Sequence, residues 1–422
     1  MILLEKKWHN NIKAKSYSSH DDQVFPPIAY CLLPVPSPPS PPCTRGLGGP
    51  VPFYKTMKEL EEVAAALDRE DYRQAAKLLK QLQKQEPENF WVQLYAGRWY
   101  EGTDKLETAE KVYRKLLKDA TNPKIVSQAR QGLQRIETIE QNRRQEAIIQ
   151  AKTDPINQEL GVLILEPLAP EKKPAAAQTL ARMLKTDPYT ARMQLQSRGW
   201  RLYKTGEMGE LKVYGQEMLE AGIPVFWVSL TEIQKLQVFR IQSIQSLSPQ
   251  PTIICQNEQD QLGSMTFNWQ EVTQRVEGLL PIFVESLDYD PRRPKSERFR
   301  HKETTQDYVQ IYDLHLPKRG CILRICDQNY DFQQGVDFSQ FSQETLPVSQ
   351  NTNRINWNLL KEQLNLLLTH AQLWSEFTPF AETTLDYTQF LGRIKPHIDL
   401  SRKSESLWDN AFHLYSGLLF LK

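Results

Sequence analysis

The sequence has no long apolar run, little net charge and few cysteines, and each absence excludes a class of protein. No stretch approaches the roughly 18 consecutive apolar residues of a membrane-spanning helix, because prolines interrupt the apolar run at residues 25–35. A formal net charge of +1 gives the chain no strong overall field for nucleic acid or an acidic membrane. Five cysteines without a repeated spacing do not indicate a disulfide framework, so we expect reduced thiols in a cytoplasmic protein.

Motifs of established chemistry are missing as well. The sequence contains no phosphate-binding glycine loop, no nucleophile elbow and no His-Glu-x-x-His motif. Cys321 and Cys326 have no second Cys/His pair at the spacing of zinc ligands. We therefore expect neither a metal nor a cofactor, and we do not expect an enzyme.

The first 56 residues differ in composition from the rest of the 422-residue chain, whose length suits about two to four domains. Ten prolines lie between Pro26 and Pro52, and proline favours extended, solvated chain that cannot build a core. Two interpretations of residues 1–56 stay open. Either they form a disordered tail that offers a proline-rich ligand, or the protein begins at Met57, where charged helical sequence starts.

Residues 57–151 have a helical pattern with an internal repeat. Alanine, leucine, lysine, glutamate and glutamine dominate this segment, and all of them favour helices. Four positions recur 34 residues later: Ala75, Leu79, Leu82 and Pro87 correspond to Ala109, Tyr113, Leu116 and Thr121. With Gly97 and Tyr100, this pattern resembles the tetratricopeptide repeat family over roughly residues 57–123, and a helix from Lys124 to about Gln150 would cap the stack. The alternative is a helical array without a binding groove.

The resemblance implies a function and a site. Members of this family bind segments of other proteins on the concave face formed by the first helix of each repeat. Transferred to this sequence, that face contains Leu60, Ala64, Leu67, Trp91, Leu94 and Arg98. Leu60, Ala64 and Leu94 stand where the carboxylate-clamping members carry lysine and asparagine, so a mixed hydrophobic groove is expected instead. Trp91 is either an anchor for the partner or part of the packing.

Residues 154–230 follow the order strand, helix, helix, strand, helix, strand, with the second strand at Trp200–Tyr203. This order resembles the C-terminal domain of the bacterial ribosomal stalk protein and the related Clp protease adaptor. The local matches are Lys204-Thr205-Gly206 and Leu219-Glu220-Ala221-Gly222. The lysine-rich factor-binding helix of the stalk protein is not reproduced. The resemblance therefore implies a small α/β interaction module and no binding of translation factors.

Residues 250–422 combine strand-like runs with apolar helices. The alternating run Tyr308–Leu316 is typical of a half-buried strand, and Lys318-Arg319-Gly320 would turn it into the hairpin partner Cys321–Cys326. Two apolar helices are expected at Trp357–Trp374 and Leu407–Leu421. This pattern predicts an α+β domain whose helices cover a face of the sheet.

A basic segment at residues 291–302 contains two prolines, which indicate an exposed loop. Its six basic residues stand against one glutamate and are Arg292, Arg293, Lys295, Arg298, Arg300 and Lys302. They could neutralise the phosphates of nucleic acid, or meet an acidic protein or an anionic headgroup. They could also form a solvated loop whose charge is offset by Glu285, Asp288 and Asp290.

Asp313 and His315 lie two residues apart, so they share one face of the expected strand. With further aspartates nearby, they could hold a metal for phosphodiester hydrolysis. A recognisable third ligand and a nuclease motif are missing, so the more common outcome, an Asp–His pair on the surface, is expected.

These patterns predict a multi-domain chain. An all-α helical repeat domain at 57–151 is followed by a small α/β module at 154–230 and an α+β domain at 250–422, with linkers near Thr153 and Ser248. This domain order resembles the multi-domain tetratricopeptide proteins of cyanobacteria. We expect a cytoplasmic scaffold or adaptor that binds another protein through its repeats. The alternatives are a nucleic-acid-associated regulator that uses the basic segment and a metal-dependent hydrolase at Asp313 and His315.

Overall fold

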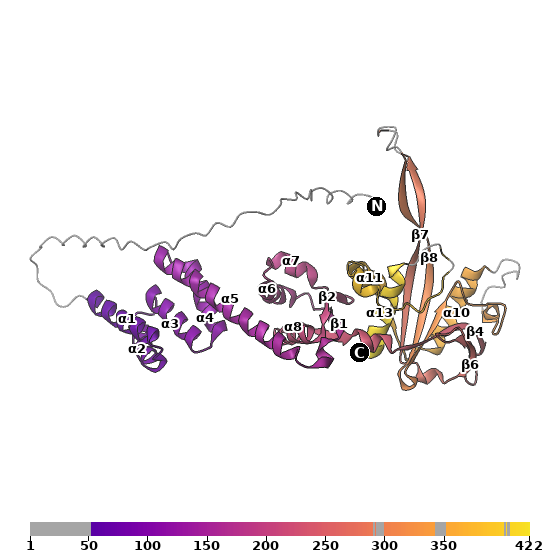
Figure 1. Cartoon of the computed structure of the whole chain (residues 1–422), viewed down its shortest axis with the longest axis horizontal. Coiled ribbons are helices and arrows are strands. Elements are labelled where there is room, and N and C mark those ends of the chain that lie inside the picture. Colours follow the sequence, from indigo (N-terminus) through magenta and orange to yellow (C-terminus); the bar gives the residue numbers. More distant parts are fainter. Residues whose placement is uncertain (1–51, 290–291, 293–298, 342–351, 401, 403–405) are drawn as a thin grey trace, which may run out of the picture. The chain divides into compact units, whose positions relative to one another are not determined.

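The computed structural model describes residues 52–289, 292, 299–341, 352–400, 402 and 406–422 (Figure 1). The chain divides into two compact units, residues 1–95 and residues 96–422, which are taken here one after the other. The two interpretations of the proline-rich leader concern a segment that lies, up to residue 51, outside the described part.

The first unit contains helices α1 (Pro52–Asp68) and α2 (Tyr72–Gln85) and the first part of α3 (Phe90–Gly102). Asp71 caps α2 by accepting a hydrogen bond of 3.0 Å from the backbone N–H of Gln74. The inward stripes of α1 and α2 are fully apolar, with buried Val63, Ala66, Ala75, Leu79 and Leu82. Because α1 begins at Pro52, the helical region is not bounded by Met57, where the sequence interpretation placed its start.

The second unit begins with the rest of α3, followed by α4 (Leu106–Asp119) and the 29-residue helix α5 (Pro123–Ala151). The ring of Tyr113 on α4 fills the space between its neighbours, because a Cβ added at Gly97 or Gly132 would lie within 2.6 Å of it. The Tyr113 hydroxyl donates a hydrogen bond of 2.8 Å to Glu101, which also accepts two from Arg135. The absence of side chains at Gly97 and Gly132 therefore lets their helices approach closely around the Tyr113 ring.

A three-stranded antiparallel sheet follows, with strand order β2-β1-β3. Its elements appear in the predicted order: β1 (Leu160–Leu165), α6 (Lys173–Leu184), α7 (Pro188–Gln194), β2 (Arg201–Glu207), α8 (Met208–Glu220) and β3 (Val225–Ser229). Residues 204–206, which the sequence interpretation placed after the strand, continue β2 because they pair with β1. Buried Leu163, Leu180, Leu211 and Met218 form a core between sheet and helices.

The second sheet has seven strands in the order β10-β7-β8-β9-β4-β5-β6. These strands are β4 (Gln237–Ser246), β5 (Thr252–Gln256), β6 (Leu262–Thr266), β7 (Gln274–Tyr289), β8 (Phe299–Leu316), β9 (Cys321–Cys326) and β10 (Gln372–Trp374). The predicted hairpin of β8 and β9 is confirmed, and Gly320 between them has a φ of +65° that favours glycine. β4 was missed, and it pairs with both β5 and β9. Ser248 therefore lies in a connection within this sheet and not in a linker between domains.

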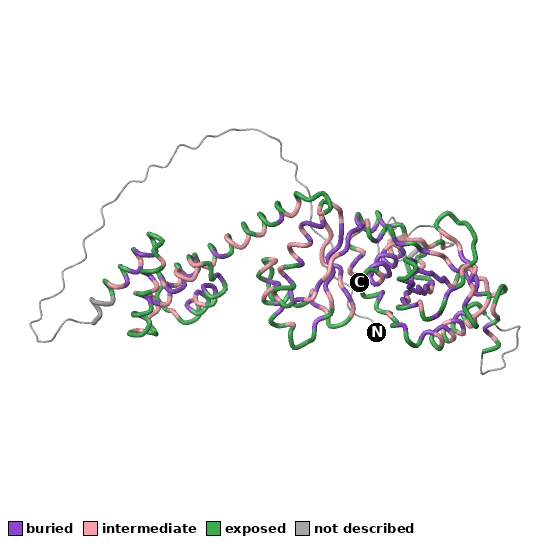
Figure 2. Tube along the Cα trace, turned by 90° about the horizontal axis from the view of Figure 1, so that it is seen from below, coloured by how far each residue is buried: buried purple, intermediate pink, exposed green. Residues whose placement is uncertain are grey.

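Helices cover both faces of the central strands (Figures 1 and 2). One face packs on α10 (Asn353–Leu367), and the other on α11 (Phe377–Thr384) and α13 (Leu407–Leu421), while α9 (Leu230–Gln234) and α12 (Thr388–Leu391) are short. The predicted helix Trp357–Trp374 ends at Leu367 because tertiary contacts capture the following chain: Arg275 donates two hydrogen bonds to the carbonyl of Ala371, and β10 joins β7. Cys255, Cys321 and Cys326 are buried and free.

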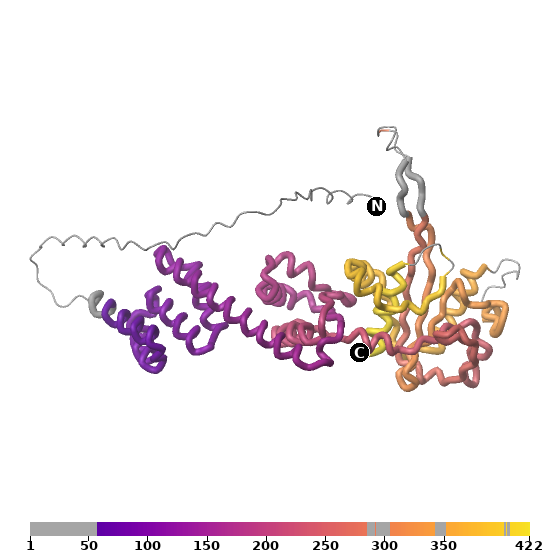
Figure 3. The backbone as a smooth tube through the Cα atoms, in the orientation of Figure 1, coloured from indigo at the N-terminus to yellow at the C-terminus, as the bar shows by residue number. Residues whose placement is uncertain are grey.

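β7 and β8 continue beyond the other strands as a two-stranded ribbon (Figure 3). β10 pairs only with residues 274–276 of β7, and β9 only with residues 311–316 of β8. Past these positions the two strands pair with each other as far as Tyr289 and Phe299. Within the described ranges, no helix has the length and apolar character needed to cross a membrane.

Candidate partner-binding site

The structure separates the six predicted groove residues into two groups. Leu60, Leu67 and Leu94 are 6%, 7% and 0% exposed, so they belong to the interior and cannot contact a partner. Leu60 and Leu67 share the inward stripe of α1 with Val63, at the spacing that a helix needs to face one core. Ala64, Trp91 and Arg98 are half-buried and stay available as contacts.

Helix α3 carries aromatic side chains that remain partly exposed. In the first unit, Trp91 and Tyr95 stand one helical turn apart, with ring centroids separated by 6.3 Å. In the second unit, Trp99 contacts Tyr100 edge-on and lies under the Lys105 ammonium, 5.4 Å from the ring centroid. The sequence interpretation missed Tyr95 and Trp99, although spacings of four residues from Trp91 would have indicated them. Half-buried aromatic rings combine a fixed position with apolar area for a partner.

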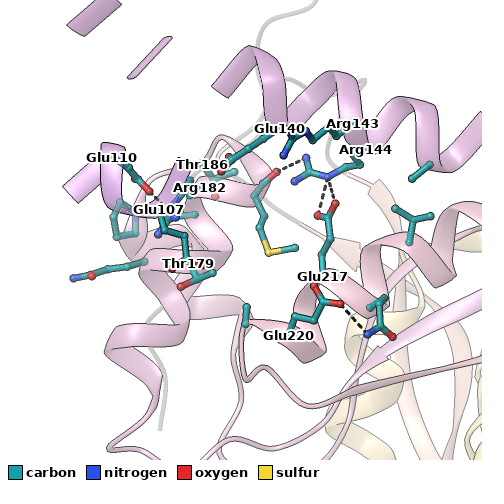
Figure 4. Close-up of a pocket in the computed structure, with 18 of the residues that line it drawn as sticks. Glu107, Glu110, Glu140, Arg143, Arg144, Thr179, Arg182, Thr186, Glu217 and Glu220 are labelled. Atoms are coloured by element: carbon teal, nitrogen blue, oxygen red, sulfur yellow. Dashed lines mark hydrogen bonds and ion pairs between the residues drawn. The ribbon is translucent and has the colours of Figure 1, made fainter. Parts of the chain in front are cut away.

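A groove of about 1420 Å³ opens among α4, α5, α6 and α8, all in the second unit (Figure 4). Arginines and glutamates cross it in pairs. Arg182 of α6 binds Glu110 of α4 at 2.8 Å, and Glu110 also binds Arg114 at 2.7 Å. Arg144 of α5 binds both carboxylate oxygens of Glu217 on α8, at 2.9 and 2.8 Å. The consecutive helices α4 and α5 thus form one polar surface with α6 and α8, which lie further along the chain, and no local motif indicates it.

Glu140 of α5 lines the same groove and differs from the other carboxylates. Burial raises its pKa, the neighbouring Glu110 and Glu217 raise it further, and Arg182 and Arg144 oppose this effect. Among the residues that the structure describes, none donates a hydrogen bond to its carboxylate. A half-buried carboxylate without a bonded cation is the least satisfied charge of the groove.

The basic segment coincides with the end of the ribbon. Arg292 is exposed, and Arg293, Lys295 and Arg298 lie outside the described residues. Arg300 and Lys302 belong to β8, so this part of the predicted loop is strand, held by pairing with β7. The register pairs Asp288 with Arg300 along the ribbon.

Asp313 and His315 share a face of β8 as predicted, but they are not on the surface, because both are 0% exposed. Asp313 forms a bidentate ion pair with Arg324 at 2.8 and 2.7 Å, and the Ser416 hydroxyl donates to Asp313 at 2.6 Å. The ring of His315 lies 2.9 Å from the same hydroxyl. Helix α13 covers this face, so substrate has no access to these side chains. The described part of the chain contains no group of three His, Cys, Asp or Glu side chains that could hold a metal.

Comparison with known proteins identifies one region of the chain. Residues 66–133 match the tetratricopeptide repeat family. The match extends from the end of α1 into α5 and so includes both predicted repeat copies apart from the beginning of the first. No curated protein and no solved structure matches the chain. The helices and this match together support a tetratricopeptide repeat region, followed by segments that contain sheets and helices.

Proposed function

We propose that this protein is an adaptor that binds another protein through its tetratricopeptide repeats. The family match at residues 66–133 carries the proposal, because such repeats form extended surfaces that bind protein segments. The expected location is the cytoplasm, and the expected relatives are the cyanobacterial proteins with a similar domain order. The small α/β module, with its resemblance to the ribosomal stalk and Clp adaptor domains, would hold the same partner or a second one.

The contact surface that we propose is the half-exposed side of α3. Trp91 and Tyr95 are the anchors, because aromatic side chains dominate the energy of most protein interfaces. Ala64, in the first unit, and Arg98, in the second, are half-buried and stay predicted contacts from the sequence. The buried leucines at positions 60, 67 and 94 hold the helices in place and make no contact with the partner.

Affinity purification from native lysate tests this proposal. The full chain is compared with a double variant, Trp91→Ala with Tyr95→Ala, and with the control Tyr189→Ala, which removes a 73% exposed ring from α7. We expect the double variant to lose protein partners that the control retains, because truncating a hot-spot aromatic costs about 2 kcal/mol or more. An unchanged set of partners in the double variant contradicts the proposal.

A parallel purification with nuclease tests the alternative of a nucleic-acid-associated regulator. That alternative rests on the basic segment, and it predicts partners that disappear with nuclease in the wild type and in both variants. Partners that resist nuclease and depend on Trp91 and Tyr95 favour the adaptor.

A further inference from the structure

The groove among α4, α5, α6 and α8 is larger than a site for a small molecule. Its volume of about 1420 Å³ exceeds the roughly 300–1,000 Å³ of typical ligand pockets. It is also open, whereas small-molecule pockets are enclosed, and half of its lining residues are charged. A groove of this size and character suits an extended, charged segment of another protein.

The cations of the groove are mostly engaged already. Arg182 and Arg114 share Glu110, and Arg144 holds Glu217 through both oxygens and approaches the carbonyl of Met183. Arg143 pairs with Asp104 at 2.6 Å, beyond the lining. An arriving carboxylate would have to displace these contacts, so the groove offers little to an acidic ligand.

The carboxylates are in the opposite situation. Within the described ranges, Glu107 and Glu140 have no bonded partner, and Glu220 accepts only from the neutral amide of Gln216 at 3.0 Å. Among the lysines of the lining, Lys111 has no bonded partner in the described part of the chain. Lys212 donates a hydrogen bond of 2.6 Å to the neutral side chain of Asn157. The lining holds five carboxylates and six cations, and in the described part of the chain three of its carboxylates but two of its cations, Lys111 and Lys212, have no ion pair. Of these groups Glu140 is the one that a pKa raised by burial marks as poorly satisfied.

An aromatic ring adds to the preference for cations. Trp227 of β3 lines the groove and is half-buried. Its ring lies against Gly215 of α8, where an added Cβ would come within 2.4 Å of it, so the glycine leaves the room that the indole occupies. An indole face attracts lysine and arginine side chains through its quadrupole.

We infer that this groove binds an extended peptide segment that carries lysine or arginine, with Glu140 as the main pairing group. The basic side chain of the peptide supplies the counter-charge that Glu140 lacks and relieves its repulsion with Glu110 and Glu217. Glu107 and Glu220 stand at the groove as further acceptors. This site is separate from the aromatic face of α3, so it gives the chain a second binding surface that does not depend on the first.

Fluorescence anisotropy with the full chain tests this inference. The probes are a labelled peptide of alternating lysine and glycine and its counterpart with glutamate in place of lysine. We expect saturable binding of the lysine peptide only, weakened about fivefold by Glu140→Gln, which keeps the shape and removes the charge. The matched control is Glu146→Gln, an exposed position on the same helix outside the lining, and it should change the affinity less than about twofold.

A charge-reversal variant provides a second test that does not depend on the affinity change in Glu140→Gln. Glu140→Lys should abolish binding of the lysine peptide and create binding of the glutamate peptide. The variant Trp91→Ala with Tyr95→Ala should leave the lysine peptide unaffected, which separates this site from the adaptor surface. Equal effects of Glu140→Gln and Glu146→Gln, or tighter binding of the glutamate peptide by the wild type, would overturn the inference.

Discussion

The groove and the interior of the seven-stranded sheet both bring arginine and carboxylate side chains together, but in different surroundings. In the groove, Arg144 and Glu217 are 14% and 31% exposed and water reaches the pair. In the sheet, Arg324 and Asp313 are 2% and 0% exposed beneath α13. The same residue types thus form a solvent-accessible network in one region, called here the open network, and a closed structural network in the other. Solvent access, not residue type, therefore distinguishes the two networks.

The largest expected effect comes from breaking the closed network. Asp313→Asn leaves the Arg324 guanidinium buried without its counter-charge, and such a loss costs about 3–5 kcal/mol. Hydrogen exchange of peptides from β8 and β9, followed by mass spectrometry, reports the free energy of opening there. Replacing both partners, by Asp313→Leu with Arg324→Met, should restore much of the protection. A loss below about 1 kcal/mol in Asp313→Asn would show that the pair contributes little.

The second-largest expected effect is a loss of stability in acid. Protonation linked to His315 should lower the free energy of unfolding by about 3 kcal/mol. Burial lowers the pKa of His315 to about 4, from its usual 6.5, with Asp313 opposing and Arg324 adding to the effect. The unfolded chain therefore binds the proton first, and the free energy of unfolding falls as the pH drops from about 6.5 to about 4. Burial likewise lowers the pKa of His397 to about 4 and that of His413 well below its usual value.

Urea denaturation between about pH 7 and about pH 4.5 measures this dependence. The change of the free energy of unfolding with pH should be smaller in His315→Gln than in the wild type. An unchanged dependence would assign the effect to other groups.

The pH dependence contributed by Glu140 in the groove should have the opposite sign. Its pKa is raised, so its contribution to stability is present below its usual pKa of 4.5 and is lost as the pH rises through its folded-state pKa.

The smallest expected effect concerns the open network. Arg144→Gln removes the two contacts with Glu217 and should cost about 1 kcal/mol, since the pair is partly solvated. The control is Arg143→Gln on the same helix, whose pair with Asp104 is 56% and 63% exposed, and it should cost less than about 0.5 kcal/mol. Hydrogen exchange of peptides from α5 and α8 measures both variants. A cost for Arg144→Gln as large as that of Asp313→Asn would remove the distinction between the two regions.

Local pattern was sufficient for the repeat helices and for the order of elements in the small α/β module. Helical spacing acts between near neighbours in the chain, and the recurrence of Ala75 and Leu79 as Ala109 and Tyr113, 34 residues later, is visible directly in the sequence. The hairpin of β8 and β9 also follows from local features, an alternating strand and a turn that ends in Gly320. The direction of each groove residue did not follow, because a stripe of leucines has the same spacing whether it faces the core or a partner.

The sequence by itself determined which segments are helical repeats and that no motif of established chemistry is present. Only the tertiary structure decided that β4 and β10 complete the second sheet, that Asp313 and His315 lie beneath α13, and that Glu140 faces an open groove. The physical reason is the range of the interactions. Helices and tight turns depend on residues a few positions apart, whereas sheet membership, burial and the pairing of charges depend on segments brought together from across the chain.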